Sequence, residues 1–260
     1  MTDPHVDRLT VYPVKGLGAQ DREVSRIRPG GTLAYDREFA LLDEDGTVCN
    51  GKQIETVHAV ETAFDAESGR LDAATADRPA ETFDLTTEEG RARAGEWFSD
   101  VFDMTLTIDR DSEVGHVDRQ SMGPSVISTA TLETVASWFE DMTVESARRR
   151  LRANIEVGGV PAFWEDRFVG ADAPAFRAGD VRIEGVTPCG RCVVPSRDPE
   201  TGEPTPEFRT KFMQRREETF PEWADREAFD HFYTMMLIAR VPEADRGKTI
   251  SVGDDVTVVE

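Results

Sequence analysis

Lysine is scarce in this 260-residue sequence, which contains only Lys15, Lys52, Lys211 and Lys248, so 26 of its 30 basic residues are arginine. Its 51 acidic residues outnumber the bases and give a formal net charge of −21. Such a surface repels nucleic acid and anionic membranes, so both are excluded as expected partners. An acid excess with few lysines is also typical of a halophile-like acidic surface, because concentrated salt screens its self-repulsion.

Long apolar runs and cysteines are also missing. No stretch approaches the roughly 20 apolar residues that a membrane-spanning helix requires, and the opening MTDPHVDRLTVYPVKG lacks the apolar segment of a secretion signal. Three cysteines are too few for a disulfide framework. With 38% hydrophobic residues the chain can still bury a core. We therefore expect a folded protein of the cytoplasm.

Short strands dominate the first part of the chain. Segments 8–14, 23–28, 57–64 and 81–86 are predicted strands, and 39–48 is a predicted hairpin around the turn DEDG. A helix is predicted over 88–102, because Ala94, Trp97, Phe98, Val101 and Phe102 share one stripe, and a further strand over 104–108.

The polar segment 110–124 marks a predicted domain boundary near its start. After it, a helix is predicted over about 130–141, with Ser128 or Thr129 as its N-cap. Predicted strands are LRANIEV, VRIEGV, MMLIARV and TISVGDDVTVVE. Segment 206–233 is predicted to form one or two helices, interrupted at Pro221. The predicted domains are residues 1–108 and 109–260.

The stretch CGRCVVPSRDPETGE places Cys189 and Cys192 three residues apart. A structural zinc site needs four cysteine or histidine ligands, and neither Cys49 nor the scattered histidines form a second pair. A dithiol redox motif normally begins a helix, which the two prolines that follow would interrupt. Two buried cysteines acting as small apolar side chains remain possible. The neighbouring Arg191 would favour a thiolate on Cys192 if the two approach in space, which makes Cys192 the better metal ligand or nucleophile and Cys189 its structural partner.

This stretch resembles the signature loop of MOSC-domain proteins, the family of the molybdenum cofactor sulfurase C-terminal domain. Four other segments resemble motifs of the same family and follow in the same order: PVKG, YDREFALLDEDG, RLRANIEVGG and ISVGDDVTVV. The layout is similar to that of the amidoxime-reducing proteins. The resemblance implies a β-rich α+β fold, with an N-terminal β-barrel-like domain followed by a MOSC β-barrel with flanking helices.

The resemblance also implies a site for molybdenum cofactor, a molybdenum-pterin with a phosphate group. Cys192 would bind the molybdenum and serve as the catalytic ligand. The expected cofactor-binding residues are Lys15, Gly16, Arg37, Ser121, Met122, Gly123, Arg152, Asn154, Gly190 and Arg191. An acidic chain must concentrate cations locally to hold a phosphate, which agrees with this set.

Each of these cations also has a plain structural interpretation. Arg37 could pair with the acids of YDRE, Arg152 could belong to a solvated basic face in ARRRLR, and Lys15 with Gly16 could be a strand-end turn. In the segment expected to cover the cofactor, Ser121, Met122 and Gly123 replace the acidic and hydroxyl residues of animal relatives, so the substrate is not predicted.

The activity implied by the resemblance is two-electron reduction of N-oxygenated compounds, such as amidoximes or hydroxylamines. An iron–sulfur cluster needs four cysteines, and this chain has three. Electrons are therefore expected from a separate ferredoxin-like protein or flavin reductase. The alternative is a non-catalytic carrier, or a sulfur-transfer accessory, for molybdenum cofactor. The pyridoxal-phosphate domain of the sulfurase proper does not fit within this length.

Overall fold

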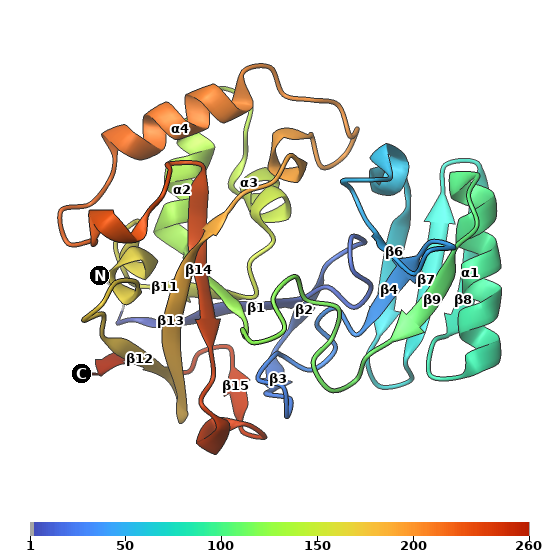
Figure 1. Ribbon diagram of the computed structural model, residues 1–260, viewed down its shortest axis with the longest axis horizontal. Coiled ribbons are helices and arrows are strands. Elements are labelled where there is room, and N and C mark those ends of the chain that lie inside the picture. The colour runs from blue at the N-terminus through green and yellow to red at the C-terminus, as the bar shows by residue number, and fades with distance from the viewer. Residues whose placement is uncertain (1–2, 260) are drawn as a thin grey trace.

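A computed structural model describes residues 3–259, and its centre is a curved sheet of eight strands (Figure 1). In sheet order the strands are β16 (Val256–Val259), β12 (Ala175–Ala178), β13 (Val181–Gly190), β14 (Thr234–Arg240), β10 (Ser125–Ser128), β11 (Ile155–Gly158), β1 (His5–Val11) and β2 (Gln20–Arg22). The alternating side chains of these strands bury an apolar cluster that includes Val6, Val126 and Phe176. The predicted β-rich α+β class is confirmed.

The eight-stranded ladder is open in residues 3–259, but its two sides approach each other. The amide of Val6 donates to the carbonyl of Asp254 at 2.9 Å, and the amide of Gly253 donates to the carbonyl of Val6 at 2.8 Å. These bonds join β1 to the residues just before β16, so the sheet curls toward a barrel. A two-stranded sheet of β3 (Val24–Arg26) and β15 (Thr249–Ser251) continues from this edge.

A second unit lies to the right in Figure 1 and has its own core. It contains two three-stranded sheets: β4 (Phe39–Leu42), β5 (Val48–Cys49) and β9 (Thr107–Arg110) in one, and β6 (Glu61–Asp65), β7 (Arg70–Thr75) and β8 (Arg78–Asp84) in the other. Helix α1 (Glu88–Phe102) covers them and buries Trp97 and Phe98. The Thr87 side chain caps this helix by accepting from the Gly90 amide.

Three further helices pack on the large sheet: α2 (Thr129–Ser137), α3 (Val144–Leu151) and α4 (Phe208–Glu218). The short 3-10 helices are η1 (Glu55–Ala59), η2 (Trp164–Phe168), η3 (Val194–Ser196), η4 (Arg226–Ala228) and η5 (Glu243–Asp245). As predicted, Ser128 caps α2, accepting from the Thr131 amide. None of the helices within residues 3–259 combines the length and apolarity needed to cross a membrane.

Several local predictions need correction. The strand predicted over 57–64 begins only at Glu61, because backbone bonds of the 3-10 type form η1 before it. Helix α3 was not predicted, and the predicted strand LRANIEV starts in its last turn. The division at 108/109 stays a prediction, as does the cytoplasmic location. The strand pairing adds that β1, near the start of the chain, lies beside β11 in the large sheet.

Candidate functional site

A cavity of about 960 Å³ lies between the large sheet and the second unit. Its walls come from segments that are distant in sequence: residues 15–19, 50–62, 117–123, 149–154 and 189–199 each contribute side chains. Its volume is in the range of cofactor and small-molecule sites. This cavity is where the predicted site residues gather.

The wall of the cavity is basic although the chain is acidic. Among the described residues that line it, ten are basic: Arg8, Lys15, Arg37, Lys52, Arg119, Arg149, Arg150, Arg152, Arg191 and Arg197. Four are acidic: Asp21, Glu61, Asp118 and Glu145. The lining therefore carries a formal charge of about +6, against −21 for the whole chain. A cavity with this imbalance attracts an anion.

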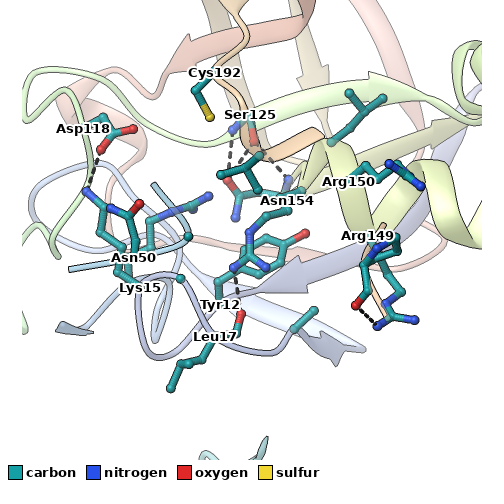
Figure 2. Close-up of a pocket in the computed structure, with 18 of the residues that line it drawn as sticks. Tyr12, Lys15, Leu17, Asn50, Asp118, Ser125, Arg149, Arg150, Asn154 and Cys192 are labelled. Atoms are coloured by element: carbon teal, nitrogen blue, oxygen red, sulfur yellow. Dashed lines mark hydrogen bonds and ion pairs between the residues drawn. The ribbon is translucent and has the colours of Figure 1, made fainter. Parts of the chain in front are cut away.

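Cys192 follows the end of β13 and lines the cavity with a half-buried side chain. In Figure 2 its sulfur is directed toward the side of the cavity where Ser125 and Asn154 lie. The Tyr233 hydroxyl donates to the Cys192 carbonyl at 3.1 Å, which fixes the backbone there. The predicted metal ligand thus faces the same space as Lys15 and Arg152.

The guanidinium of Arg191 contacts Cys189 rather than Cys192. Its Nη1 lies 3.2 Å from the Cys189 sulfur, and its Nη2 donates to the Leu151 carbonyl at 3.0 Å. Residues two apart in extended backbone share a side, so Arg191 pairs with Cys189. From the sequence, a thiolate on Cys192 depended on the approach of Arg191; the contact in the structure is instead with Cys189. Both sulfurs and Arg191 still line the cavity.

The Tyr12 ring contacts two of the predicted cations. The Arg152 Cζ is 3.9 Å from the centre of its ring, and the Arg37 Cζ is 5.1 Å from it. The Tyr12 hydroxyl donates to the Ala153 carbonyl at 3.2 Å. Both arginines have left-handed backbone, with φ of 58° at Arg152 and 51° at Arg37. The ring therefore holds the two guanidiniums in one region of the wall despite their repulsion.

The two arginines differ in how their charge is compensated. Burial lowers the pKa of Arg152 to about 10, and its Nη2 donates to the neutral Leu17 carbonyl at 2.9 Å. Partial burial would lower the pKa of Arg37 too, but its contact with the Asp36 carboxylate outweighs that effect and raises the pKa. Burial raises the pKa of Tyr12 to about 12, so the phenol stays neutral. Of these two arginines, Arg152 is the one that a bound anion would stabilise more.

Lys15 and Gly16 occupy the loop after β1. Lys15 Nζ lies 2.6 Å from Asp118 Oδ1, and this cation lowers the pKa of Asp118 although partial burial of the carboxyl acts in the opposite direction. Gly16 has φ of +93°, and a Cβ there would lie 2.9 Å from the Asn50 Cβ. Only glycine lets this loop pass the neighbouring segment, so the fold itself explains Gly16.

Asn154 is buried beneath the cavity and holds strands together. Its Oδ1 accepts from the amide of Ser125 at 3.1 Å and from the Ser125 hydroxyl at 3.0 Å, while its Nδ2 donates to the Thr10 carbonyl at 3.1 Å. At Gly190, an added Cβ would meet only the His231 ring, at 3.8 Å. The fold would accept a side chain there, so any need for glycine comes from what enters the cavity.

Only part of the segment expected to cover the cofactor lines the cavity. Met122 and Gly123 line the cavity, whereas Ser121 is exposed and is not one of the described lining residues. The amide of Gly123 donates to the Ala239 carbonyl at 2.6 Å, and a Cβ on it would come 2.7 Å from the Gly31 carbonyl oxygen. This close packing fixes the segment against β14.

Models of two protein families match the chain. The MOSC N-terminal beta barrel domain matches residues 3–145, and the MOSC domain matches residues 119–257. The chain belongs to the MOSC family. The cavity is built from both matched regions, because Lys15 and Arg37 lie in the first and Arg152 and Cys192 in the second.

Two curated relatives are nematode proteins named molybdenum cofactor sulfurase. The one from Caenorhabditis briggsae is 26% identical over 232 residues, covering 78% of this chain and 30% of the relative. The one from Caenorhabditis elegans is 24% identical with the same coverage. This MOSC chain thus spans about 30% of the length of these relatives. The crystal structure of YUAD protein from Bacillus subtilis aligns with a TM-score of 0.43 and 10% identity over 98% of this chain and 94% of that one, too distant for residue comparison.

Two residues that line the MOSC cavity carry a buried polar atom without a partner. Within residues 3–259, the buried Nε of Arg191 and the buried Nε2 of His58 have no hydrogen-bond partner. Burial, followed by the nearby Arg152, Arg197 and Arg149, lowers the pKa of His58, so its ring is neutral. His58 was missed from the sequence because η1 was predicted as a strand.

A metal ion would find few protein ligands in this MOSC fold. No group of three or more histidine, cysteine or carboxylate side chains in the described part of the chain could hold one. The four-ligand zinc interpretation of the cysteine pair therefore has no support in this geometry. Cys192 could ligate a metal only if the metal arrives with a group that supplies the other ligands. The basic wall and the Cys192 sulfur fit such an anionic group.

Proposed function

We propose that this protein binds molybdenum cofactor in the basic cavity, with Cys192 as the protein ligand to molybdenum. Membership of the MOSC family and similarity to molybdenum cofactor sulfurases support a function related to this cofactor. The observation that carries the proposal is the Cys192 sulfur, which lines a cavity with a formal charge of about +6 in a chain of −21. Soft thiolates suit a metal of this kind.

The residues divide the work of holding the cofactor. Arg152 and Arg191 supply cations whose protein partners are neutral carbonyls or sulfur, and Lys15 and Arg37 add charge already shared with acids. Met122 and Gly123 shield one side, and Asn154 keeps the floor rigid. Gly190 leaves room for close approach. When bound, the cofactor supplies the two-electron chemistry, and the chain orients it and excludes water.

The activity that we propose is reduction of N-oxygenated compounds by a separate electron donor, ferredoxin-like or flavin-based. The volume of the cavity supports a small substrate beside a cofactor. Removing oxygen as water consumes protons, and the neutral ring of His58 in the wall can carry one. The electron donor would be a separate protein, because an iron–sulfur cluster needs four cysteines. Cys189 and Cys192 face the cavity, and only Cys49 lies elsewhere.

Metal content and turnover test this proposal together. The protein is purified without oxygen from a molybdate-fed host, molybdenum and zinc are measured per chain, and benzamidoxime reduction is followed with a chemical reductant. We expect molybdenum with turnover. Stoichiometric zinc without molybdenum would refute the proposal. Cys192→Ala should abolish molybdenum binding, whereas Cys189→Ala should retain it and mainly lower stability; equal molybdenum loss from both would disprove the assignment of the ligand.

A second candidate is a carrier, or a sulfur-transfer accessory, for molybdenum cofactor. The names of the two nematode relatives favour it, because sulfuration rather than reduction is their printed role. The same measurement separates the candidates: molybdenum without turnover on any N-oxygenated compound supports the carrier. Release of intact cofactor to an acceptor apoenzyme would support it further.

A further inference from the structure

Helix α3 carries three successive arginines that contact three different neighbours, because consecutive helical residues point about 100° apart. Arg148 Nε donates to Glu156 Oε2 at 2.7 Å on the strand side. Arg149 reaches Glu200 at 3.3 Å on the surface. Arg150 turns inward and is only 5% exposed. A solvated basic face would not bury one of its members.

The buried guanidinium of Arg150 fastens the loop that follows Cys192. Its Nη1 donates to the carbonyls of Pro195 at 3.0 Å and Arg197 at 2.6 Å. The same nitrogen contacts Thr205 Oγ1 at 3.2 Å, and Nη2 contacts Asp198 Oδ2 at 3.2 Å. One side chain therefore holds both the outgoing and the returning arm of the loop.

Arg149 also reaches this loop, donating from its Nη2 to the Pro199 carbonyl at 2.8 Å, but the loop has little apolar packing. Within 193–205 the regular structure is the short helix η3, an isolated bridge between Arg197 and Pro204, and the turn at 198–202, and Pro195 is the one buried residue of that segment. Segments with few buried apolar contacts open easily. Polar bonds, rather than apolar packing, therefore fix its position, and Arg150 makes more of the bonds between the loop and α3 than Arg149 does.

The same turn of α3 also anchors the residue before Cys192. The Leu151 carbonyl accepts from Arg191 Nη2 at 3.0 Å. On the opposite side, Tyr233 accepts from the Arg191 amide at 2.9 Å and donates its hydroxyl to the Cys192 carbonyl at 3.1 Å. Cys192 is thus held between α3 and the start of β14 on one side, and by the Arg150-bound loop on the other.

We propose that Arg150 is a positioning residue for Cys192: by locking the loop 193–205 onto the last turn of α3, it keeps the sulfur directed into the cavity. The inference rests on the proposed function for the role of Cys192 as ligand. The positioning itself is a property of the chain alone, and it can be tested without cofactor.

The test compares thiol labelling in the full chain, produced in a host that cannot make molybdenum cofactor. Native protein is labelled with iodoacetamide for increasing times and then digested with trypsin. Cleavage after Arg191 separates the two cysteines into IEGVTPCGR and CVVPSR. Cys49, which is 1% exposed, reports on global unfolding in the same sample. The variants are Arg150→Met and the milder Arg150→Lys, with Arg216→Met as a matched control for loss of a buried arginine.

In Arg150→Met we expect labelling of Cys192 to accelerate on the order of tenfold while Cys49 stays protected, because several charge-assisted bonds of the loop are lost. Arg150→Lys keeps the charge but fewer bonds, so a rise of about threefold is expected. Arg216→Met should lower the unfolding temperature and change Cys192 labelling less than about twofold.

Unchanged Cys192 labelling in folded Arg150 variants would overturn the inference, as would an equal rise in Arg216→Met. If Arg150→Met does not fold, the Arg150→Lys variant decides by the same criterion. Because no molybdenum is involved, failure here leaves the proposed function standing. Conversely, absence of molybdenum from the wild type would refute the proposed function and not the positioning role.

Discussion

Two regions of the molecule pack an arginine against aromatic rings, and only one of the two opens to the cavity. Arg152 lies 3.9 Å from the Tyr12 ring centre and lines the cavity wall. Arg216 lies 4.5 Å from the Phe163 ring centre, is fully buried, and pairs with Asp166. The local stacking is alike, so a guanidinium on a ring does not by itself indicate a ligand site.

What differs is the counter-charge. Asp166 neutralises Arg216, and the rings of Phe220 and Phe229 also lie within 5.6 Å of its Cζ. Arg152 forms no ion pair with the carboxylates described in residues 3–259; Asp36 acts on it only from nearby, and its hydrogen-bond acceptor is the Leu17 carbonyl. A buried cation paired with a buried carboxylate stabilises the fold, whereas one that faces an open cavity without an ion pair favours an incoming anion.

The largest effect is expected from breaking the buried Arg216–Asp166 pair, which, with the aromatic rings around it, we call the sealed region. Arg216→Met leaves the Asp166 carboxylate buried without its cation, which costs about 3–5 kcal/mol in the free energy of unfolding. Urea denaturation measures the loss. Arg215→Met is the matched control, since Arg215 on the same helix forms an exposed pair with Glu218 and should cost less than about 1 kcal/mol. Equal losses would mean that the buried pair contributes no more than the exposed one.

Removing the cavity arginine should affect binding more than stability. Arg152→Met is expected to weaken retention of molybdenum cofactor about 10- to 100-fold, the value of a charged hydrogen bond. Arg37→Met should weaken it less, because Asp36 already compensates that charge. Molybdenum retained per chain during dialysis at rising salt gives the comparison. A larger loss from Arg37→Met would reverse our ranking of the two arginines.

The sequence predicted features set by local rules. The stripe around Trp97 and the cap at Ser128 appear where expected, because helix periodicity and capping depend on neighbouring residues. It did not predict which arginine of ARRRLR is buried, since that depends on where α3 packs. The Arg191–Cys189 contact was missed because the predicted strand stopped at residue 186, whereas β13 continues to Gly190.

Membership of the cavity wall could be predicted only where a family motif covered it. Lys15, Arg152 and Cys192 belong to such motifs and do meet in one cavity. His58 and Arg149 line the same cavity but come from segments whose folding was predicted differently or not at all. Tertiary packing, rather than local pattern, brings these two to the wall.

The sealed region should also respond to pH. Glu165 lies beside Asp166, and burial first, then that neighbouring carboxylate, raises the pKa of Glu165 above its ordinary 4.5. The native state therefore keeps a proton that the unfolded chain releases, so the free energy of unfolding falls as pH rises above about 4.5 until the raised pKa is passed.

Glu165→Gln removes this proton equilibrium. The free energy of unfolding of this variant, relative to that of the wild type, should increase by roughly 1–2 kcal/mol as the pH rises from about 5 to 8. Thermal unfolding across this range measures the gap, with Glu133→Gln, an exposed position on α2, as the control that should show none. A gap that narrows with rising pH would contradict the predicted direction.

The smallest effect is expected at the rim of the cavity, where Asp118 pairs with Lys15 and so competes with a bound anion for this cation. Its carboxyl is 71% exposed, so Asp118→Asn should change the free energy of unfolding by less than about 1 kcal/mol. Since Lys15 holds the pKa of Asp118 below its ordinary value, this small contribution is present near neutral pH and is lost as pH falls.

The freed Lys15 should strengthen cofactor retention by up to about fivefold. Glu113→Gln removes the same charge at an exposed position that does not line the cavity, so it separates a local effect from the change in net charge. Weaker retention in Asp118→Asn alone would show that the carboxylate orients Lys15 rather than competing with the anion.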